Sequence, residues 1–230
     1  MIDAMNAGGP IKSEKGGARQ AMVDDVYERL KSSVLDHVVE PGHRINVDAL
    51  TRVFAVSQTP IREALARLEA EGLVVKEPLR GFRASPPLSN AEFEELYDFR
   101  LLLEPWAAAR AAQRITPDAA AGLEQELASW TSAPESSGYF GYRELSAHDA
   151  RFHGRIVELA ENGPLSTAYE RLHAHLHLFR LNYQRTIGDE AIREHRAITA
   201  AIVAGRPDDA EQAMRLHLTA SRDRLREFAA

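Results

Sequence analysis

Four side chains in the second half of the chain have the residue types and the spacing of metal ligands. Asp149 and His153 are four residues apart, which places both on one face of a helix, within a stripe of apolar residues. His195 is in register with the isoleucines of its own segment, and His217 follows a methionine by one turn. A carboxylate and imidazoles that face a protein interior need partners. A divalent metal would satisfy them: zinc suits the set best, with nickel or manganese as alternatives, and positions would stay open for water or an oxyanion.

A second histidine cluster competes with this interpretation. His173 and His177 are also four residues apart, with His175 between them, but they flank the apolar stripe of their segment and no carboxylate accompanies them. We therefore rank this cluster lower, although one member could line a cavity. His148 points about 100° away from Asp149, so it is expected at the surface. A single inward histidine is more often a hydrogen-bonded core residue than a ligand, so the prediction depends on the combination.

The segment from Val56 to Leu68 predicts a short helix that presents polar groups to DNA. Its apolar residues recur at helical spacing and must face a core, whereas Gln58, Thr59 and Arg62 project together from the opposite face. Arginine can bind a guanine edge or a phosphate, glutamine can pair with adenine, and threonine can reach a phosphate or a thymine methyl. The hydroxyls of Ser57 and Thr59 are possible N-caps. The apolar residues are Ile61, Ala64, Leu65 and Leu68.

The flanking segments complete a winged helix-turn-helix with three helices and a two-stranded wing. A two-residue link between the second helix and the DNA-reading helix has the spacing of a helix-turn-helix. Arg80 and Gly81 lie at the tip of the wing, where an arginine beside a glycine can approach a minor groove or a phosphate. The two preceding helices are predicted at Met22–Val38 and Val47–Phe54, and the strands at Leu73–Lys76 and Phe82–Ala84.

The rest of the chain predicts an all-α bundle of about six helices, so the protein is mainly α. Short connections favour antiparallel neighbours, whose faces can enclose a cavity. Pro86-Pro87 marks a boundary, and we expect a flexible arm over 1–20, a DNA-binding domain over 21–86 and a helical domain over 87–230. The predicted helices run approximately over Asn90–Arg114, Pro117–Ser132, Tyr139–Glu161, Pro164–Thr186, Asp189–Ala204 and Pro207–Phe228.

The formal net charge of −6 on 230 residues would by itself argue against a nucleic-acid partner. Residues 1–86, however, hold 12 of the 28 basic and 12 of the 34 acidic residues, so the acidic excess lies entirely in residues 87–230. A neutral module with its arginines on one face can still bind phosphates. The absence of cysteine excludes disulfides and thiolate chemistry. We find no signal peptide, membrane span or Gly-rich phosphate loop, and we expect a cytoplasmic protein without a membrane partner.

The segment from Pro41 to Ala84 resembles the winged-helix domain of GntR-type bacterial transcription factors. Its V-S-Q-T-P-I-R-E-A-L core and its R-G wing follow that family's pattern. The resemblance implies that double-stranded operator DNA is contacted by the three exposed residues of the reading helix and by the two residues of the wing tip. Two positions depart from the pattern: Gln58 stands where many members have arginine, and Asp48 stands where some have a DNA-contacting arginine. The operator is expected to differ there.

The helical part resembles the FCD ligand-binding domain of the FadR branch of this family. The matching motifs include H-D-A-R-F-H at His148–His153, E-H-R-A-I at Glu194–Ile198 and M-R-L-H-L at Met214–Leu218. In metal-binding members the ligands match Asp149 and the three histidines named with it at the outset. A count of six helices, not seven, suggests the VanR-like subgroup.

The same resemblance implies a homodimer and a small carboxylate effector near the metal. Arg100 is the predicted fixed cation for that effector, because it shares a face with the apolar residues of its helix. Its alternative role is an internal ion pair with Glu104, and the two roles can coexist. Arg180 and Tyr183 are weaker candidates for the same pocket.

These observations predict a DNA-binding transcriptional regulator, more often a repressor, whose operator affinity changes when an effector prefers one arrangement of the bundle. An enzyme is not expected. Two alternative classes stay open. A metal-dependent enzyme could activate water with Asp149 and the three histidines, although only Glu104 or Glu194 offers a general base. A protein-interaction adaptor would show no salt-dependent DNA affinity.

Overall fold

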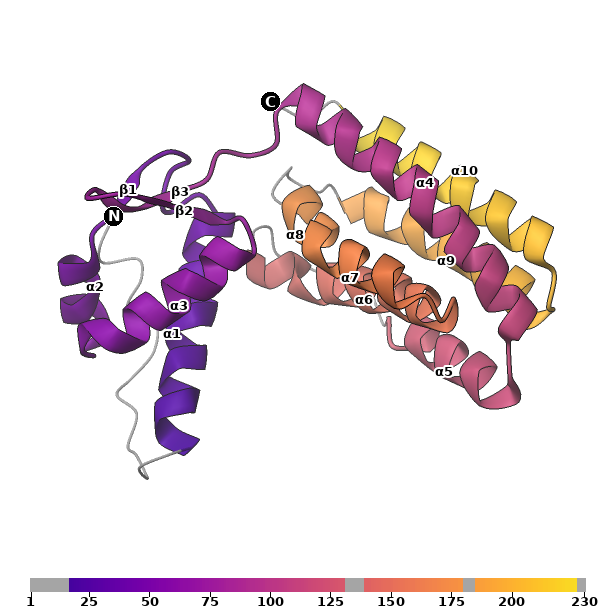
Figure 1. Ribbon diagram of the computed structural model, residues 1–230, viewed down its shortest axis with the longest axis horizontal. Coiled ribbons are helices and arrows are strands. Elements are labelled where there is room, and N and C mark those ends of the chain that lie inside the picture. The colour runs from indigo at the N-terminus through magenta and orange to yellow at the C-terminus, as the bar shows by residue number, and fades with distance from the viewer. Residues whose placement is uncertain (1–16, 131–138, 180–184, 227–230) are drawn as a thin grey trace. The chain divides into compact units, whose positions relative to one another are not determined.

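The computed structural model describes residues 17–130, 139–179 and 185–226, and the chain forms two compact units, Met1–Pro86 and Pro87–Ala230 (Figure 1). Most of the predicted arm, up to residue 16, lies outside the described residues. So do the predicted break at 132–138 and the two weaker pocket candidates, Arg180 and Tyr183.

The first unit contains the three predicted helices, α1 (Gly17–Leu35), α2 (Val47–Phe54) and α3 (Gln58–Ala70). The Asn46 side chain caps α2 by accepting a hydrogen bond from the Ala49 amide. Ala55 then adopts a left-handed conformation, with φ 54°, which turns the chain sharply into α3. The predicted apolar face of α3 is fully buried against the rest of this unit, at Ile61, Ala64, Leu65 and Leu68.

A small antiparallel sheet completes this unit, with β1 (Arg44–Ile45), β2 (Val74–Glu77) and β3 (Gly81–Ala84) in the order β1-β3-β2. The two predicted wing strands are present, in a register that pairs Val74 with Ala84. The third strand was not predicted, because a two-residue strand shows no alternation. It pairs Ile45 with Phe82 and so places both side chains in the core.

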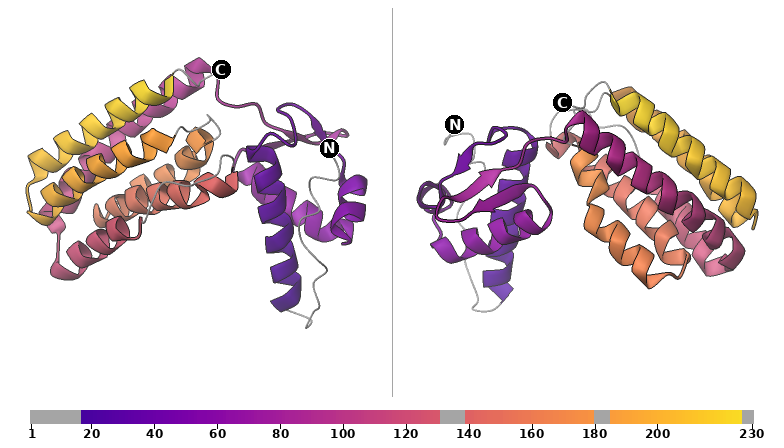
Figure 2. Two further views of the ribbon diagram at one scale, coloured as in Figure 1. Left: turned by 180° about the vertical axis from the view of Figure 1, so that it is seen from behind. Right: turned by 45° about the horizontal axis from the view of Figure 1, so that its top comes forward.

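Among its described residues, the second unit has helices as its only regular secondary structure. Its helices α4 and α10 lie side by side in both views of Figure 2, and α6, α7 and α9 also pack on α4. Four of these helices, α4, α5, α7 and α10, start at an N-cap side chain or at a proline in the first turn. At α4, Ser89 and Glu92 form a reciprocal capping box. The helices are α4 (Asn90–Arg114), α5 (Pro117–Ala128), α6 (Tyr139–Leu159), α7 (Gly163–Leu172), α8 (Ala174–Phe179), α9 (Arg185–Val203) and α10 (Pro207–Leu225).

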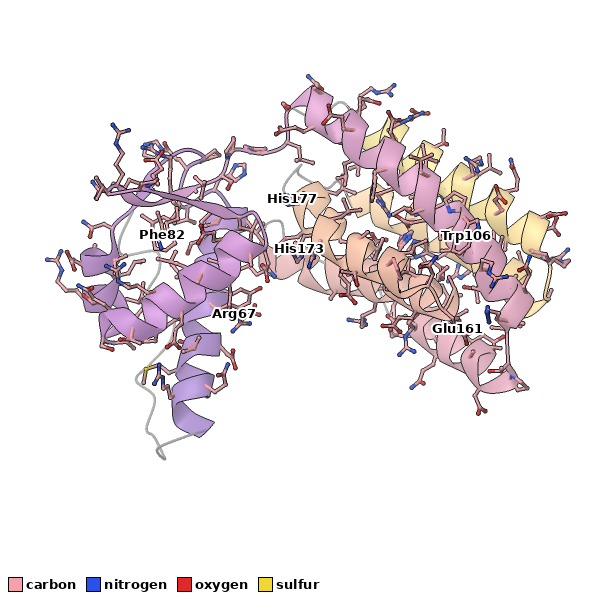
Figure 3. All side chains as sticks on the ribbon, viewed as in Figure 1. Arg67, Phe82, Trp106, Glu161, His173 and His177 are labelled. Atoms are coloured by element: carbon pink, nitrogen blue, oxygen red, sulfur yellow. The ribbon has the colours of Figure 1, made fainter. Side chains whose placement is uncertain are left out.

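One predicted helix is divided. The segment expected as a single helix from Pro164 breaks at His173, which is left-handed with φ 44° and ends α7 before α8 begins. Figure 3 labels His173 and His177 in this region. The described residues of this unit therefore contain seven helices, so the count of six that suggested the VanR-like subgroup does not support it. In the part of the chain that is described, no helix is both long and apolar enough to cross a bilayer.

Candidate DNA-reading face and metal centre

The reading helix α3 exposes the three polar residues expected on its free face, Gln58, Thr59 and Arg62. Ser57 occupies the N-cap position but makes no side-chain capping bond, and Thr59 lies inside the first turn, so the expected hydroxyl caps are not formed. The Gln58 side chain instead donates from Nε2 to Oδ1 of Asp48 on α2, at 2.7 Å. The two positions that depart from the GntR pattern are thus in direct contact.

The wing tip is fully exposed and tightly turned. Gly81 has φ 86°, a conformation that side-chain-bearing residues rarely adopt, and Leu79 is also left-handed with φ 62°. Arg80 lies between them and is exposed. Arg83 on β3 pairs with Glu77 across the hairpin, with Nε 3.1 Å from Oε1, which stabilises the strands behind the tip. The tip therefore presents one arginine beside an unobstructed backbone.

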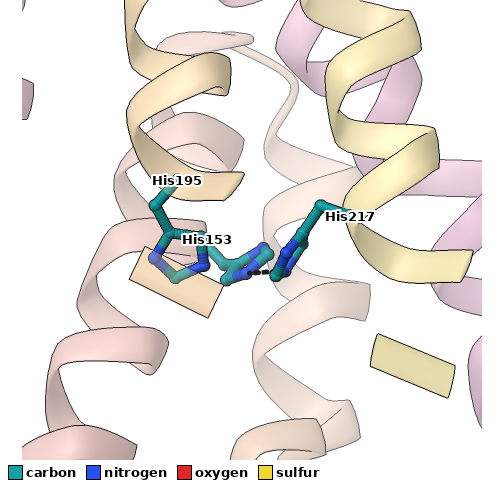
Figure 4. Close-up of side chains that lie close together, drawn as sticks. All are labelled: His153, His195 and His217. Carbon is teal, nitrogen blue, oxygen red and sulfur yellow. Dashed lines mark hydrogen bonds between the residues drawn. The ribbon is translucent and has the colours of Figure 1, made fainter. Parts of the chain in front are cut away.

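Three histidines from three helices meet in the interior of the second unit (Figure 4). His153 on α6, His195 on α9 and His217 on α10 are all buried, and one ring nitrogen of each lies within 4.8 Å of the others. The His153 and His217 Nε2 atoms are 3.2 Å apart. Each histidine faces the interior because the apolar residues on the same face of its helix are buried, as their spacing predicted. On α9 these residues are Ile192, Ile198 and Ile202.

Asp149, the fourth predicted ligand, lies at the edge of this histidine cluster. Its Oδ1 atom is 3.4 Å from Nε2 of His195 and 3.8 Å from Nε2 of His153. Its Oδ2 atom accepts a hydrogen bond from Nδ1 of His175, at 2.6 Å, and the other ring nitrogen of His175 bonds to the Tyr169 hydroxyl. Burial alone would raise the pKa of Asp149, but the neighbouring histidines, His175 first, hold it well below its usual value.

Two histidines of the cluster each bond through Nδ1 to a carboxylate, and that carboxylate is paired with an arginine. Nδ1 of His153 lies 2.6 Å from Oε2 of Glu104, which is paired with Arg100 on the same helix. Burial would raise the pKa of Glu104, but Arg100 and His153 keep it well below its usual value. Arg100 therefore forms the internal ion pair that was its alternative role, with both side chains at most 2% exposed.

The second such arrangement supports His217. Its Nδ1 lies 2.8 Å from Oε2 of Glu194, which accepts two hydrogen bonds from Arg224, at 2.6 and 2.8 Å. Burial would raise the pKa of Glu194, but His217 and Arg224 lower it to about 2, so this group is a carboxylate at neutral pH.

These carboxylates fix the chemistry of the cluster. A carboxylate only accepts, so Nδ1 carries a proton in both His153 and His217, and their Nε2 atoms are directed toward each other. Burial lowers the pKa of His153 to about 4, which keeps that ring neutral at pH 7. Two ring nitrogens 3.2 Å apart repel each other unless a proton or a cation lies between them. Nε2 of His195 is also buried without a hydrogen bond from the described residues. The donor set therefore fits a divalent cation.

His148 is not at the surface as expected. It is 1% exposed, because α5 packs over this side of α6 and brings Glu126 to 3.2 Å from its Nδ1. Glu126 also accepts from Arg151 and is 5% exposed. The His148 ring lies next to His195, with the two ring centroids 5.7 Å apart.

A cavity opens beside the histidine cluster. Its polar lining includes two arginines, two imidazoles and two hydroxyls, and its apolar lining includes Leu145 and Leu178. The sequence indicated Arg100 but missed Arg224, although Arg224 follows His217 by two helical turns and shares its face. His175 lines this cavity, as the sequence allowed for one member of the second histidine cluster, but its bond to Asp149 was not predicted because Asp149 belongs to a different helix. The polar lining residues are Arg100, Ser146, Asp149, His175, His217, Ser221 and Arg224.

A winged helix with an exposed reading face and a helical domain with a buried ligand cavity define the class of transcriptional regulators that bind DNA and an effector. Comparison with known proteins agrees. Residues 22–83 match the bacterial regulatory proteins of the gntR family, and residues 95–220 match the FCD domain. The chain belongs to the GntR family, with a C-terminal FCD domain.

Individual relatives extend over most of the chain. The Nta operon transcriptional regulator of Aminobacter aminovorans is 31% identical over 190 residues, which cover 82% of this chain and 87% of that protein. The transcriptional repressor RspR of Escherichia coli is 27% identical over 91% of each chain. Among solved structures, E. coli McbR/YncC has the same fold, with a TM-score of 0.68 and 21% identity over 90% of this chain and 97% of that one.

Proposed function

We propose that this GntR regulator senses a small organic acid through a divalent metal in its FCD domain and changes its operator affinity in response. The observation that carries the proposal is the convergence of three buried imidazoles, one of which, His217, also lines a cavity together with Asp149 and two arginines. His153, His195, His217 and Asp149 would hold the metal; the imidazole-rich set favours zinc, with nickel or manganese as alternatives.

Charge explains why a metal would be needed to bind an acid. Each arginine of the cavity already has its own carboxylate, Arg100 with Glu104 and Arg224 with Glu194. Asp149 adds a further negative charge. Without a cation the cavity therefore carries no surplus positive charge to attract an anion. A bound divalent metal supplies that charge as a Lewis acid for an oxyanion, and Arg100 and Arg224 then orient the rest of the ligand through their remaining N–H groups.

The DNA-binding half of the proposal assigns major-groove contacts to Gln58, Thr59 and Arg62 and minor-groove or phosphate contacts to the wing residues Arg80 and Gly81. All five are exposed and lie on the free face of α3 or at the wing tip. Two copies of such a face, related by a dyad, would read two half-sites in successive major grooves. The effector can shift DNA affinity only by binding the two arrangements of the dimer unequally.

We propose a homodimer formed through the outer face of α4. Phe99, Leu102 and Trp106 follow one another at helical spacing and are 37%, 73% and 42% exposed (Trp106 is labelled in Figure 3). Large apolar side chains gathered on one exposed helix face are typical of an interface. A repressor role is also proposed, supported by the similarity to RspR.

An enzymatic role is the second candidate, because an aspartate and three histidines can activate water. The two carboxylates that could act as a general base already accept hydrogen bonds from other side chains. Glu104 accepts from Arg100 and His153. Glu194 accepts from Arg224 and His217. This arrangement favours ligand binding over turnover. Hydrolysis or rearrangement of any acid by the zinc-loaded protein would reverse that preference.

Thermal unfolding of the protein with a panel of mono-, di- and hydroxycarboxylic acids tests the proposal. After chelation and reloading with Zn²⁺, at least one acid should raise the melting temperature, and the same acid should do nothing in the chelated protein. An acid that stabilises both forms equally would show that the metal plays no part in effector binding.

A further inference from the structure

The reading face contains a carboxylate, although it must approach a polyanion. Asp48 is the second residue of α2 and Gln58 is the first of α3, and the turn at Ala55 brings them together, with Nε2 of Gln58 2.7 Å from Oδ1 of Asp48. Both residues are exposed on the side of the module that carries Arg62. A bond from an amide to a carboxylate is charge-assisted and therefore stronger than a bond between neutral groups.

This bond determines which way the Gln58 amide is turned. With its nitrogen toward Asp48, its oxygen faces Arg62, whose Nη2 approaches Oε1 at 3.5 Å. Oδ1 of Asp48 and the amide oxygen of Gln58 are thus directed toward donors of the protein itself. The groups of Gln58 and Arg62 that lie outside these bonds are the second N–H of Gln58 and the remaining N–H groups of Arg62, all of which are donors.

A freely turning glutamine pairs with adenine because it offers one donor and one acceptor, which match N7 and the N6 amino group. Guanine instead offers two acceptors, N7 and O6. We propose that Asp48 is a positioning residue for base recognition: by holding Gln58 it leaves N–H donors from Gln58 and Arg62 side by side, which selects a guanine edge over an adenine edge. This inference rests on the proposed reading face and adds to it the base that is preferred.

The same residue has a second, separable effect. A carboxylate near the duplex repels the phosphates of DNA of any sequence. Asp48 therefore lowers the affinity for all DNA while it increases the preference for one base. Asn in its place keeps an oxygen that can accept from Gln58 but removes the charge. Ala removes both. The two substitutions therefore separate positioning from repulsion.

Selection of bound duplexes from a random-sequence library, followed by sequencing, tests the inference with the full-length protein. The wild type should enrich guanine at the base pair read by Gln58 and Arg62. Asp48→Asn should keep that motif and bind all duplexes more tightly. Asp48→Ala should also bind more tightly, but its preference for guanine over adenine should fall by about 5-fold or more, since one bidentate base contact is worth that much discrimination.

Two further variants make the result decisive. Asp208→Ala is the matched control, because Asp208 is likewise the second residue of an exposed helix start, on α10 of the other unit, and it should change neither motif nor affinity. Gln58→Ala should alter the same base pair as Asp48→Ala. If Gln58→Ala alters the motif and Asp48→Ala does not, the positioning role is wrong. If Gln58→Ala alters nothing, the reading face itself is wrong.

Discussion

Replacement of Glu104 by glutamine tests the buried ion pair that supports His153 of the proposed metal site. The substitution keeps the size and shape of the side chain but removes its charge, and it leaves the guanidinium of Arg100, which is 1% exposed, without a counter-ion. Breaking a buried ion pair from one side costs about 3–5 kcal/mol. Since a domain of this kind has a free energy of unfolding of roughly 5–15 kcal/mol, the metal-free variant should lose a large share of its stability.

Urea unfolding of the chelated protein, followed by circular dichroism, measures this loss. Glu211→Gln is the matched control, because Glu211 and Arg215 are the same residue types four residues apart, in the opposite order and with side chains 44% and 46% exposed. It should cost at most about 1 kcal/mol. The double variant Arg100→Leu with Glu104→Gln should recover part of the loss, because the unpaired charge is then gone.

Metal affinity provides a second measurement on the same variant. Glu104 accepts the Nδ1 proton of His153 and so directs Nε2 toward the cluster. Loss of such a partner typically weakens metal binding by about 10–100-fold. If Glu104→Gln unfolded at the same urea concentration as Glu211→Gln and bound zinc like the wild type, the supporting role of this carboxylate would be refuted.

Three further predictions concern DNA binding, acid stability and assembly. Arg62→Ala should weaken operator binding by about 1–3 kcal/mol and relax preference at one base pair, measured by fluorescence anisotropy; unchanged affinity and preference would exclude this face of α3. Burial lowers the pKa of His153 to about 4, so between about pH 6.5 and 4 the unfolded chain binds a proton that the folded chain does not. The chelated protein should therefore lose about 3 kcal/mol of stability as the pH falls through that window, and a flat profile in pH-dependent urea unfolding would contradict it. Leu102→Glu should convert the dimer to a monomer in analytical ultracentrifugation, and an unchanged sedimentation coefficient would place the interface elsewhere.

Local signals in the sequence predicted much of the fold. The bounds of α2 and α4 agree with the expectation because an Asn or Ser cap begins each helix and a distinct turn or proline ends it. The inward direction of His195 also followed from local spacing, since its isoleucine neighbours had to be buried. Hydrophobic periodicity is a property of one segment, so it predicts the face of a helix well.

Pairings between segments could not be predicted in this way. The division of one helix at His173 depends on a single left-handed residue inside an otherwise periodic pattern. His148 was misplaced because the helix that buries it, α5, is distant in sequence. Glu104 reaches His153 across 49 residues and Glu194 reaches His217 across 23, so these supporting contacts depend on how the helices pack.

A metal in the FCD domain should couple the binding of an organic acid to the affinity for operator DNA. Fluorescence anisotropy with an operator from the random-sequence selection tests it, using the acid that most stabilises the zinc-loaded protein. In the wild type with Zn²⁺ that acid should change the operator dissociation constant, and both a chelator and His195→Ala should abolish the change while DNA binding persists. A response as large in the chelated protein and in His195→Ala as in the zinc-loaded wild type would show that the metal does not couple the acid to DNA binding.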